Sequence, residues 1–488
     1  MKHEMIIGKY TLESLTNGMY ASPFDMYREY IQNSVDSFDD AVEAGIELAG
    51  KLAIEITVDR IGRTIVIRDN GCGLRARDAE RTLLDIGNSQ KKSVSSRGFR
   101  GIGRLAGLSY CEKLAFKTSY KGEETATVIE FDASLLKEML LPGSQNSVSV
   151  EDVMNRIVTV RTEKETANRR YFQVTLEGVW NEAGLTDLAA VREYLVQHAP
   201  LCFSSSFKWG RTVVEKLRLS GYCIPQYMIK LNGEALYKPY SDTFISDRLK
   251  KNLDVISDVR IVTFRRGDRL SAVLWYADTG FFGTIIDNAI KGIRIRQGNI
   301  LIGDKGTCSL FFKEERFNGW LIGELYVVDK DIIANSRRDG FEKNAAYYEL
   351  LSMLRDWAFE ISKEIRRLSY ERSILSQKKV MPEVEQEQPD GANDENSLYS
   401  EDMAYAEDDV KSADWSDESD EPLETDYITR LGLLLNRKKV QTKYTALNIN
   451  EKLTIEQRKV LERVFDLILR DYDRPTAERF IDTISKEF

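Results

Sequence analysis

The sequence predicts an α/β protein whose first domain is a two-layer sandwich, in which helices cover one face of a single sheet. Helix-like and strand-like stretches alternate over residues 1–200. Most of the strand-like stretches alternate apolar and polar side chains, which is typical of strands with one buried face. Their order along the chain favours mostly antiparallel pairing. A length of 488 residues is too great for one compact core and predicts two or three domains.

The elements of this first domain, which we place at residues 1–203, follow one another in order. Residues 15–45 have the periodicity of a helix. Five segments then have the pattern of strands: KLAIEITVDR, RTIVIRD, LAFKTSY, TATVIEF and NRIVTVRTE. The segment LTDLAAVREYLVQHAPL closes the domain as a helix.

A second α/β domain, which we call the middle domain, is predicted for residues 204–379. Its strands are expected in SAVLWYAD, in NAIKGIRIRQGNILIG and in GWLIGELYVVD. Residues 344–374 then form a long amphipathic helix, because apolar residues recur there at i, i+3 and i+4.

The C-terminal part of the chain divides into an acidic segment and a helical one. Between residues 383 and 426 there are 18 acidic residues and one lysine, a net charge of −17 within a chain whose total is −9. Such like charge with few large aliphatic residues predicts a disordered linker over 380–427. A small helical region is predicted for 428–488. The total charge therefore says little about partners, because the rest of the chain is mildly basic.

Composition argues against several classes of protein. There are two histidines and five scattered cysteines without a CxxC pair, so a zinc site or disulfide framework is not expected. We expect His198 to be an ordinary packed or surface histidine. No uncharged apolar run approaches the ~20 residues that span a bilayer, and the first residues lack the pattern of a secretory signal. A cytoplasmic protein without a membrane partner is the expectation.

The predicted first helix carries a polar stripe. Glu29, Asn33 and Asp36 are spaced i, i+4 and i+7, which places them within about 60° of one another around a helix. An ordinary amphipathic helix with its polar face in water explains the stripe equally well. A carboxylate can also orient a water molecule for attack on phosphorus, and an amide oxygen one turn later can complete the shell of a Mg²⁺ ion.

A second motif follows the strand RTIVIRD. Asp69 is followed by Gly71 and Gly73, and glycines with this spacing allow the backbone to approach a flat ligand or to take positive φ. An aspartate at this place can accept a hydrogen bond from the exocyclic amine of adenine. The alternative is a surface hairpin turn, because Asp-Asn-Gly is a common turn sequence.

A third motif places Gly98, Gly101 and Gly103 before a predicted helix. A glycine-rich loop that leads into a helix N-terminus offers free N–H groups to a phosphate. The loop lacks the downstream acid of a dinucleotide-binding fingerprint and the Gly-Lys-Ser/Thr of a P-loop.

The order ExxxNxxD, DxGxG and GxxGxG within 75 residues resembles the GHKL ATPases, which include gyrase, the heat-shock chaperones, histidine kinases and MutL. The resemblance implies their Bergerat-type fold and a site for ATP and Mg²⁺. Glu29 would activate water, Asn33 would hold Mg²⁺ and Asp69 would bind adenine. The further nucleotide contacts implied are Asp36, Gly71, Gly73, Gly98, Arg100, Gly101, Ile102 and Gly103.

Residues 1–375 resemble in particular the ninety-kilodalton heat-shock chaperones. DIGNSQKK is similar to the start of their ATP lid and implies nucleotide contacts at Asn88 and Ser89. VVDKDIIANSRRDGFEKN is similar to the loop of their middle domain that sends an arginine to the γ-phosphate, which implies Arg338, with Arg337 as the alternative. A solvated Arg-Arg-Asp turn is the other explanation. A family threonine on a later strand has two candidates, Thr125 and Thr159.

The lid and the tail depart from the chaperones. The segment from Ser89 to Gly98 is short and resembles that of the microrchidia ATPases, and the tail is too small for the chaperone dimerisation domain. We therefore expect a Mg²⁺-dependent ATPase that acts as a conformational clamp and forms a homodimer through its N-terminal domains.

Three hypotheses about what the clamp does remain open. The first is a chaperone-like remodeller of a protein client, and the second is a DNA clamp of the MutL or microrchidia kind. For DNA, the segments KGIRIRQGN and VRIVTFRRGDR supply basic residues, although a solvated sheet face explains them too. The third is a non-hydrolysing ATP sensor.

Overall fold

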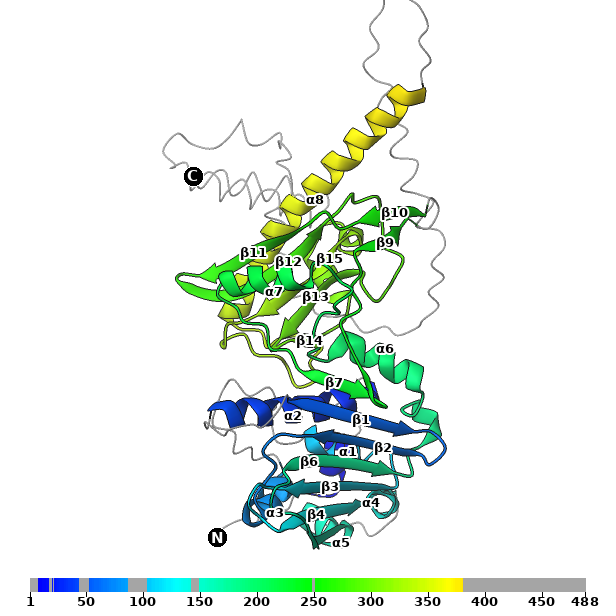
Figure 1. Ribbon diagram of the computed structural model, residues 1–488, viewed down its shortest axis with the longest axis vertical. Coiled ribbons are helices and arrows are strands. Elements are labelled where there is room, and N and C mark those ends of the chain that lie inside the picture. Colours follow the sequence, from blue (N-terminus) through cyan, green and yellow to red (C-terminus); the bar gives the residue numbers. More distant parts are fainter. Residues whose placement is uncertain are drawn as a thin grey trace, which may run out of the picture. The chain divides into compact units, whose positions relative to one another are not determined.

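Two large sheets, a two-stranded ribbon and the helices that accompany them form the described part of the protein, shown in Figure 1 as a computed structural model. The structure describes residues 8–16, 20, 22–43, 52–86, 103–141, 149–247 and 251–380. Residues 381–488 lie outside these ranges, and with them nearly all of the predicted linker and the predicted C-terminal helices.

The first sheet has eight strands in the order β5-β4-β3-β6-β2-β1-β7-β8. Every neighbouring pair is antiparallel except β1 and β7, which are parallel. The prediction of an α/β protein with a mostly antiparallel first sheet is therefore confirmed. The strands are β1 (Ala53–Asp59), β2 (Thr64–Asp69), β3 (Lys113–Ser119), β4 (Thr125–Asp132), β5 (Val158–Lys164), β6 (Tyr171–Glu177), β7 (Met228–Leu231) and β8 (Glu234–Ala235).

Helices pack on one face of this sheet. The alternate side chains of its strands that point to this face form one apolar core with residues of α1, α2, α4, α5 and α6. Burial of such apolar surface is the main favourable term in folding. The helices that precede the second sheet are α1 (Tyr10–Thr16), α2 (Asp25–Glu43), α3 (Ala76–Leu84), α4 (Ala133–Leu140), α5 (Val150–Ile157), α6 (Leu188–His198) and α7 (Gly210–Leu219).

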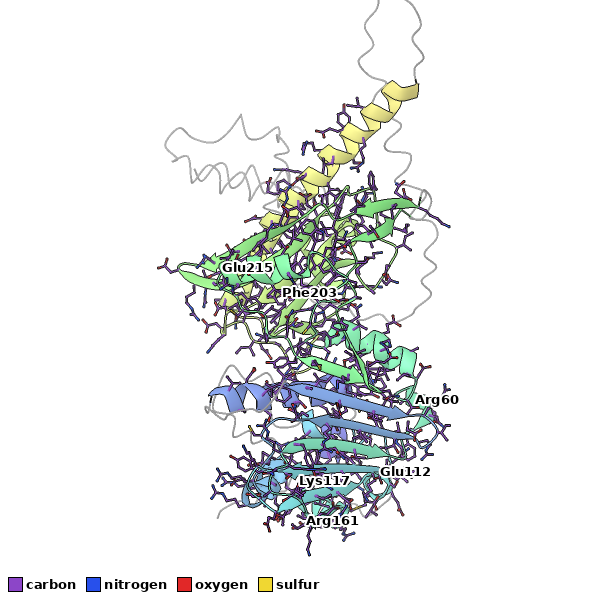
Figure 2. All side chains as sticks on the ribbon, in the orientation of Figure 1. Arg60, Glu112, Lys117, Arg161, Phe203 and Glu215 are labelled. Carbon is purple, nitrogen blue, oxygen red and sulfur yellow. The ribbon has the colours of Figure 1, made fainter. Side chains whose placement is uncertain are left out.

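The other face of the first sheet carries paired charges. Lys117 contacts Glu163 at 2.5 Å, and Arg161 contacts Glu130 at 3.0 Å. Figure 2 labels Lys117 and Arg161 on β3 and β5. Exposed ion pairs of this kind contribute little to stability, so their position indicates a face in contact with water.

The helix predicted over residues 15–45 is wrong in its extent. The structure has two helices there, and α2 begins only at Asp25. Pro23 lacks an N–H group and disfavours helical geometry at the residue before it. Ser22 instead forms a turn, in which its N–H donates to Asp25 Oδ2 at 3.3 Å and its hydroxyl accepts from Phe24 N at 3.3 Å.

The sequence analysis missed β6 and misplaced the end of the first sheet. β6 lies between β3 and β2, in the middle of the sheet. The last two strands, β7 and β8, come after residue 203, where we placed the end of the first domain. β7 joins because it pairs with β1 in parallel, a long-range pairing that local patterns do not reveal. The division of residues 204–379 into a separate domain stays a prediction.

The second sheet has five strands in the order β11-β12-β15-β13-β14. The long helix α8 (Ala345–Val380) packs its apolar side chains on it, as the periodicity predicts. β9 (Thr243–Ser246) and β10 (Asn252–Val255) form a separate antiparallel ribbon. The strands of the sheet are β11 (Asp258–Arg266), β12 (Arg269–Asp278), β13 (Gly292–Gln297), β14 (Ile300–Ile302) and β15 (Ile322–Val327).

None of the helices in the described ranges combines the length and the apolar character that crossing a membrane requires.

A glycine on β15 provides a test of the second sheet. A Cβ atom added at Gly323 would lie 2.2 Å from the carbonyl oxygen of Trp275 and 2.9 Å from the Cα of Tyr276, both backbone atoms of β12. We predict that Gly323→Ala lowers the free energy of unfolding by about 3 kcal/mol, because the two strands must separate to admit the methyl group. Urea unfolding measures this. Gly8→Ala is the control, since nothing lies within 4 Å of its Cβ position, and equal stability of the two variants would contradict the strand pairing.

Candidate functional site

Helix α2 carries the predicted polar stripe. Glu29 and Asp36 are buried, with 8% and 2% of their surface exposed, and Asn33 is partly exposed. The apolar residues on the opposite side, such as Val35 and Phe38, are fully buried in the core. A stripe of two buried carboxylates is not the water-facing side of an ordinary surface helix, so the simpler explanation is wrong for Glu29 and Asp36.

The end of the glycine loop lies against Glu29. Gly103 begins a short 3-10 helix, Gly103–Leu105, and a Cβ atom at its position would come 2.2 Å from Glu29 Oε2. The hydroxyl of Tyr30 holds this segment, because it donates to the carbonyl of Arg104 at 3.2 Å and accepts from Gly107 N at 2.8 Å. Only a residue without a side chain lets the loop backbone pass this close to the carboxylate.

Asp69 is a buried carboxylate at the end of β2. Its Oδ1 atom accepts from Gly71 N at 2.9 Å, whereas the buried Oδ2 atom has no hydrogen-bond partner among the described residues. Burial raises the pKa of Asp69 to about 6. Interactions with the Ser34 hydroxyl and with the backbone N–H groups of Gly71 and Phe172 favour the ionised carboxylate and lower the pKa, but their effect is smaller than that of burial. An unpartnered buried acceptor fits a hydrogen-bond donor supplied by a ligand.

The glycines after Asp69 let the chain turn tightly beneath two strands. Gly73 has a φ of +67°, and its Cβ would lie 2.0 Å from the carbonyl oxygen of Ser119 and 2.8 Å from that of Tyr171. The alternative of a hairpin turn is wrong, because the chain continues from here into α3 and not into a strand paired with β2.

Arg338 reaches Glu29 from the chain that follows the second sheet. Its Nε atom lies 3.4 Å from Glu29 Oε1, and both side chains are only 10% exposed. Arg338 has a φ of +57°, an unusual conformation for a residue other than glycine, and its carbonyl accepts from Gly303 N at 2.8 Å. Arg337 is exposed. The solvated turn that the sequence also allowed therefore describes Arg337 and not Arg338.

Arg28, which the sequence analysis passed over, holds the same turn. Its Nη2 atom donates to the carbonyl oxygen of Arg337 at 3.1 Å, and its Nη1 atom lies 3.3 Å from Asp25 Oδ1. The sequence gives little indication of this role. Arg28 directly precedes Glu29, but a charged residue on a helix is ordinarily exposed.

Several predicted site residues are not placed at the site. Neither threonine candidate lies beside Asp69, because Thr125 and Thr159 are on β4 and β5, which β3 and β6 separate from β2. Asp69 is paired instead with Phe172 on β6. A further set falls outside the described residues: Asn88, Ser89, Gly98, Arg100, Gly101 and Ile102.

The two basic segments do not form a free positive surface. Arg294 and Arg296 of KGIRIRQGN are each 1% exposed, so both the DNA-binding and the solvated-face explanations are wrong for them. In the other segment, Arg266 and Arg269 each pair with Asp329 and Asp331. β13 lies in the middle of the sheet, between β15 and β14, which is why its charged side chains are buried.

A metal site built on Asn33 would need few protein ligands. No group of three or more His, Cys, Asp or Glu side chains suited to a metal occurs within the part of the chain that the structure describes. Mg²⁺ in nucleotide sites takes one or two protein oxygens, and phosphates and water supply the rest. The single amide of Asn33, next to the acids of α2, fits that chemistry.

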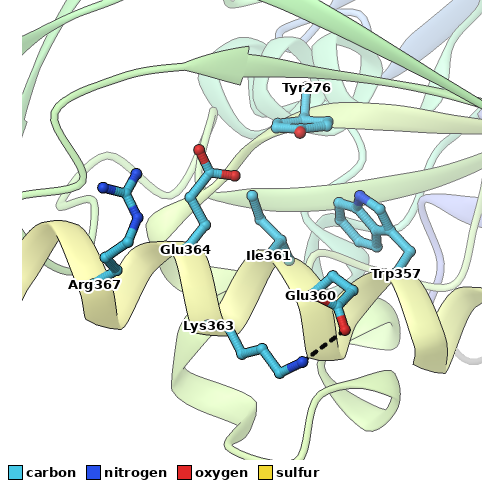
Figure 3. A pocket seen from close by; sticks show the side chains of 7 residues that line it. All are labelled: Tyr276, Trp357, Glu360, Ile361, Lys363, Glu364 and Arg367. Atoms are coloured by element: carbon cyan, nitrogen blue, oxygen red, sulfur yellow. Dashed lines mark hydrogen bonds and ion pairs between the residues drawn. The ribbon is translucent and has the colours of Figure 1, made fainter.

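A separate hollow lies on α8, away from these residues. It has a volume of about 390 Å³ and is lined mainly by charged residues of α8 around Tyr276 and Trp357 (Figure 3). Lys363 and Glu360 pair across 2.8 Å there. Ligand sites of this size are mostly apolar, so the hollow has the character of a solvated groove.

His198 stacks on Tyr194, with the ring centroids 3.9 Å apart. This confirms the prediction of an ordinary packed histidine.

Comparison with known proteins gives one family and two kinds of relative. Residues 22–156 match the family described as histidine kinase-, DNA gyrase B-, and HSP90-like ATPase. The DNA mismatch repair protein MutL of Ehrlichia chaffeensis is 28% identical over 286 residues, which are 52% of this chain and 40% of that protein. MutL of Chlamydia pneumoniae is 34% identical over 20% of this chain and 17% of the relative. The chaperone protein HtpG of Acinetobacter baylyi is 27% identical over 23% of this chain and 20% of the relative.

The chain thus spans less than half the length of each of these relatives. The family match covers α2 with Glu29, the β2 turn with Asp69, and the glycine motif that ends at Gly103. Residues 22–156 therefore form an ATPase domain of the GHKL superfamily.

Proposed function

We propose that this protein binds and hydrolyses ATP with Mg²⁺ and uses the cycle to open and close as a conformational clamp. The observation that carries the proposal is the buried contact between Glu29 on α2 and Arg338 from the chain beyond the second sheet. A hydrolytic site needs a group that acts on water and a cation that stabilises the phosphoryl group. These two side chains, 309 positions apart in the sequence, supply both.

The nucleotide would be held by the first sheet and α2. Asp69 Oδ2, which lacks a partner among the described residues, would accept from the exocyclic amine of adenine. Asn33 would hold Mg²⁺, with Asp36 close to its water shell. The bound ion would neutralise phosphate charge. The backbone at Gly103, close to Glu29, would meet the phosphates together with the residues before it.

Glu29 would orient the attacking water, and Arg338 would bind the transferring phosphoryl group. In the structure their charges satisfy one another, and both side chains are only 10% exposed. A γ-phosphate competes for the arginine, because it carries more negative charge than one carboxylate. Binding would therefore draw Arg338 from Glu29 to the phosphate and free the carboxylate for catalysis.

The clamp follows from where these groups come from. Arg338 lies beyond β15, so its attachment to the nucleotide would bias how the second sheet meets the first. Two protomers would associate through their N-terminal domains in the ATP state. A non-hydrolysing sensor is the less favoured alternative, because Glu29 and Arg338 are both present and in contact.

A protein client is the partner we favour, as for the HtpG relative, a chaperone protein by name. Of the arginines that suggested a DNA surface, Arg294 and Arg296 are buried, and Arg266 and Arg269 are paired with acids, which weakens that support for nucleic acid. DNA remains the second candidate, because the similarity to the mismatch repair protein MutL extends over 52% of this chain.

Glu29→Gln and Arg338→Ala test the catalytic assignment. We expect each to lower kcat for Mg²⁺-ATP hydrolysis by about 100-fold or more, with ATP still bound, because the proposed contacts of Asp69, Asn33 and the backbone at Gly103 remain. Steady-state phosphate release and calorimetric ATP binding measure the two quantities.

Arg337→Ala is the matched control for that experiment. Its side chain is exposed, and its contact with Arg28 runs through the backbone carbonyl, which alanine keeps. We expect near wild-type turnover. If Arg337→Ala were as impaired as Arg338→Ala, or if Arg338→Ala turned over like the wild type, the assignment would be wrong.

The raised pKa of Asp69 predicts a pH dependence of stability without nucleotide. Its pKa of about 6 in the folded protein exceeds the ordinary value of 3.8, so the folded protein binds this proton more tightly than the unfolded chain does. The stability it contributes is complete below about pH 4 and is lost as the pH rises through about 6. An asparagine side chain does not titrate, so the variant Asp69→Asn should not show this loss. Between about pH 4 and 7, its free energy of unfolding should rise by about 2–3 kcal/mol relative to that of the wild type.

Urea unfolding of both proteins at several pH values measures that difference. A difference that stays constant over the range would mean that folding does not raise the pKa of Asp69, and would contradict the prediction.

Duplex DNA separates the two partner hypotheses. The protein-client proposal predicts that DNA leaves the ATPase rate unchanged at physiological salt. Stimulation that falls steeply between about 50 and 200 mM salt would favour the DNA clamp, because phosphate contacts release counterions.

A further inference from the structure

The hairpin of β13 and β14 (residues 292–302) lies between α6 and the turn that carries Arg338. Its Arg296 belongs to a cluster of buried charges: Arg296 contacts Glu324 on β15 at 2.5 Å, and Lys238 contacts the same carboxylate at 2.8 Å. All three side chains are at most 1% exposed. β14 lies beside α6, as Figure 1 also shows.

One side of this hairpin holds the C-terminal end of α6. Arg296 Nη2 donates to the carbonyl oxygen of Gln197 at 2.8 Å, and Arg294 Nε donates to the side-chain oxygen of the same residue at 2.6 Å. Asn299 Nδ2 donates to the carbonyl oxygen of Pro225 at 2.7 Å, just before β7. The hairpin is therefore attached to the segment between β6 and β7, two strands of the first sheet.

Helix α6 is attached in turn to the start of α2. The hydroxyl of Tyr194 donates to Asp25 Oδ1 at 2.9 Å, and its ring stacks on Phe24 with the centroids 5.6 Å apart. Asp25 pairs with Arg28. The residue after Arg28 is Glu29, so the position of α6 is tied to the helix that carries the proposed base.

The other side of the hairpin holds the turn that carries Arg338. Gln297, the residue after Arg296, donates from Nε2 to the carbonyl oxygen of Ile332 at 2.8 Å. Gly303 N, directly after β14, donates to the carbonyl oxygen of Arg338 itself at 2.8 Å. The same short hairpin thus contacts the turn before and at Arg338.

Burying these charges is costly, so packing alone does not explain them. A buried ion pair often stabilises a fold no more than apolar residues of the same size would, and its retention then favours one geometry over others. Here two cations, Lys238 and Arg296, share the carboxylate of Glu324. Burial lowers the pKa of Lys238 to about 7. Arg296 also donates to three backbone carbonyl oxygens: from Nη1 to those of Ala199 and Asn299, and from Nη2 to that of Gln197.

We propose that Arg296, held in place by Glu324 and Lys238, is a positioning residue that fixes Arg338 against Glu29 through the β13–β14 hairpin. The inference rests on the proposed ATPase function. Arg296 acts at a distance: it sets where the arginine of the second sheet meets α2, and it touches neither nucleotide nor water.

A double-mutant cycle tests this. Arg296→Met should lower kcat about tenfold or more and leave the dissociation constant for ATP within a factor of about two. In the background of Arg338→Ala it should have no further effect on kcat, because its influence passes through that arginine. Arg296→Lys, which keeps the charge, should recover part of the activity.

Two further variants separate positioning from stability. Arg260→Met is the control, because Arg260 pairs with Asp278 and Glu364 at the β11 edge of the same sheet, away from α6; its kcat should match the wild type. Gln297→Leu leaves the buried charges in place and removes the contact with Ile332, so it should reproduce the kinetic defect with a smaller loss of thermal stability.

The outcomes distinguish this inference from the proposed function. Additive effects of Arg296→Met and Arg338→Ala, or an equal defect in Arg260→Met, would overturn the positioning role and leave the ATPase intact. Equal turnover of the wild type and Arg338→Ala would overturn the proposed function instead. Hydrogen exchange of the amides of Gly303 and Arg338 tests separately whether the hairpin holds the turn. Gln297→Leu should accelerate exchange at both amides, and unchanged exchange would contradict the attachment.

Discussion

The ion pair between Glu29 and Arg338 is the contact on which the rest of the site depends. It joins α2, which packs on the first sheet, to the turn that follows the second sheet. Because both side chains are 10% exposed, neither charge can exchange its partner for bulk water at little cost. The two sheets must therefore meet in a way that keeps these groups together, or a bound phosphate must take the place of one of them.

Several features of the fold serve that contact. Gly103 lets the loop backbone pass beside the carboxylate, and a positive φ at Arg338 directs its side chain inward. Arg28 holds the neighbouring carbonyl, and the β13–β14 hairpin holds the turn from the other side. The site thus combines segments that are distant in the sequence.

Sequence patterns predicted β1 to β5 and the polar stripe of α2, because alternation and the 3.6-residue period are local properties. They did not predict β6, β7 or β8. The family resemblance favoured Arg338 and left Arg337 as the alternative, because the choice depends on one backbone conformation that contacts with Gly303 and Arg28 hold. Sequence patterns could not predict the burial of Arg294 and Arg296 either. Charged residues on a strand are usually exposed, and the partner Glu324 is 28 residues further along the chain. The break before α2 was missed, although Pro23 disfavours helical geometry at the residue before it.

The most direct test of the account is a crystal structure of the protein with ADP, Mg²⁺ and aluminium fluoride, which mimics the transferring phosphoryl group. The account predicts that Arg338 leaves Glu29 and hydrogen-bonds the fluoride group, while Glu29 binds the water in line with it and Asp69 accepts from the adenine amine. An Arg338 that still pairs with Glu29, or that lies in solvent while the nucleotide is bound, would contradict the clamp.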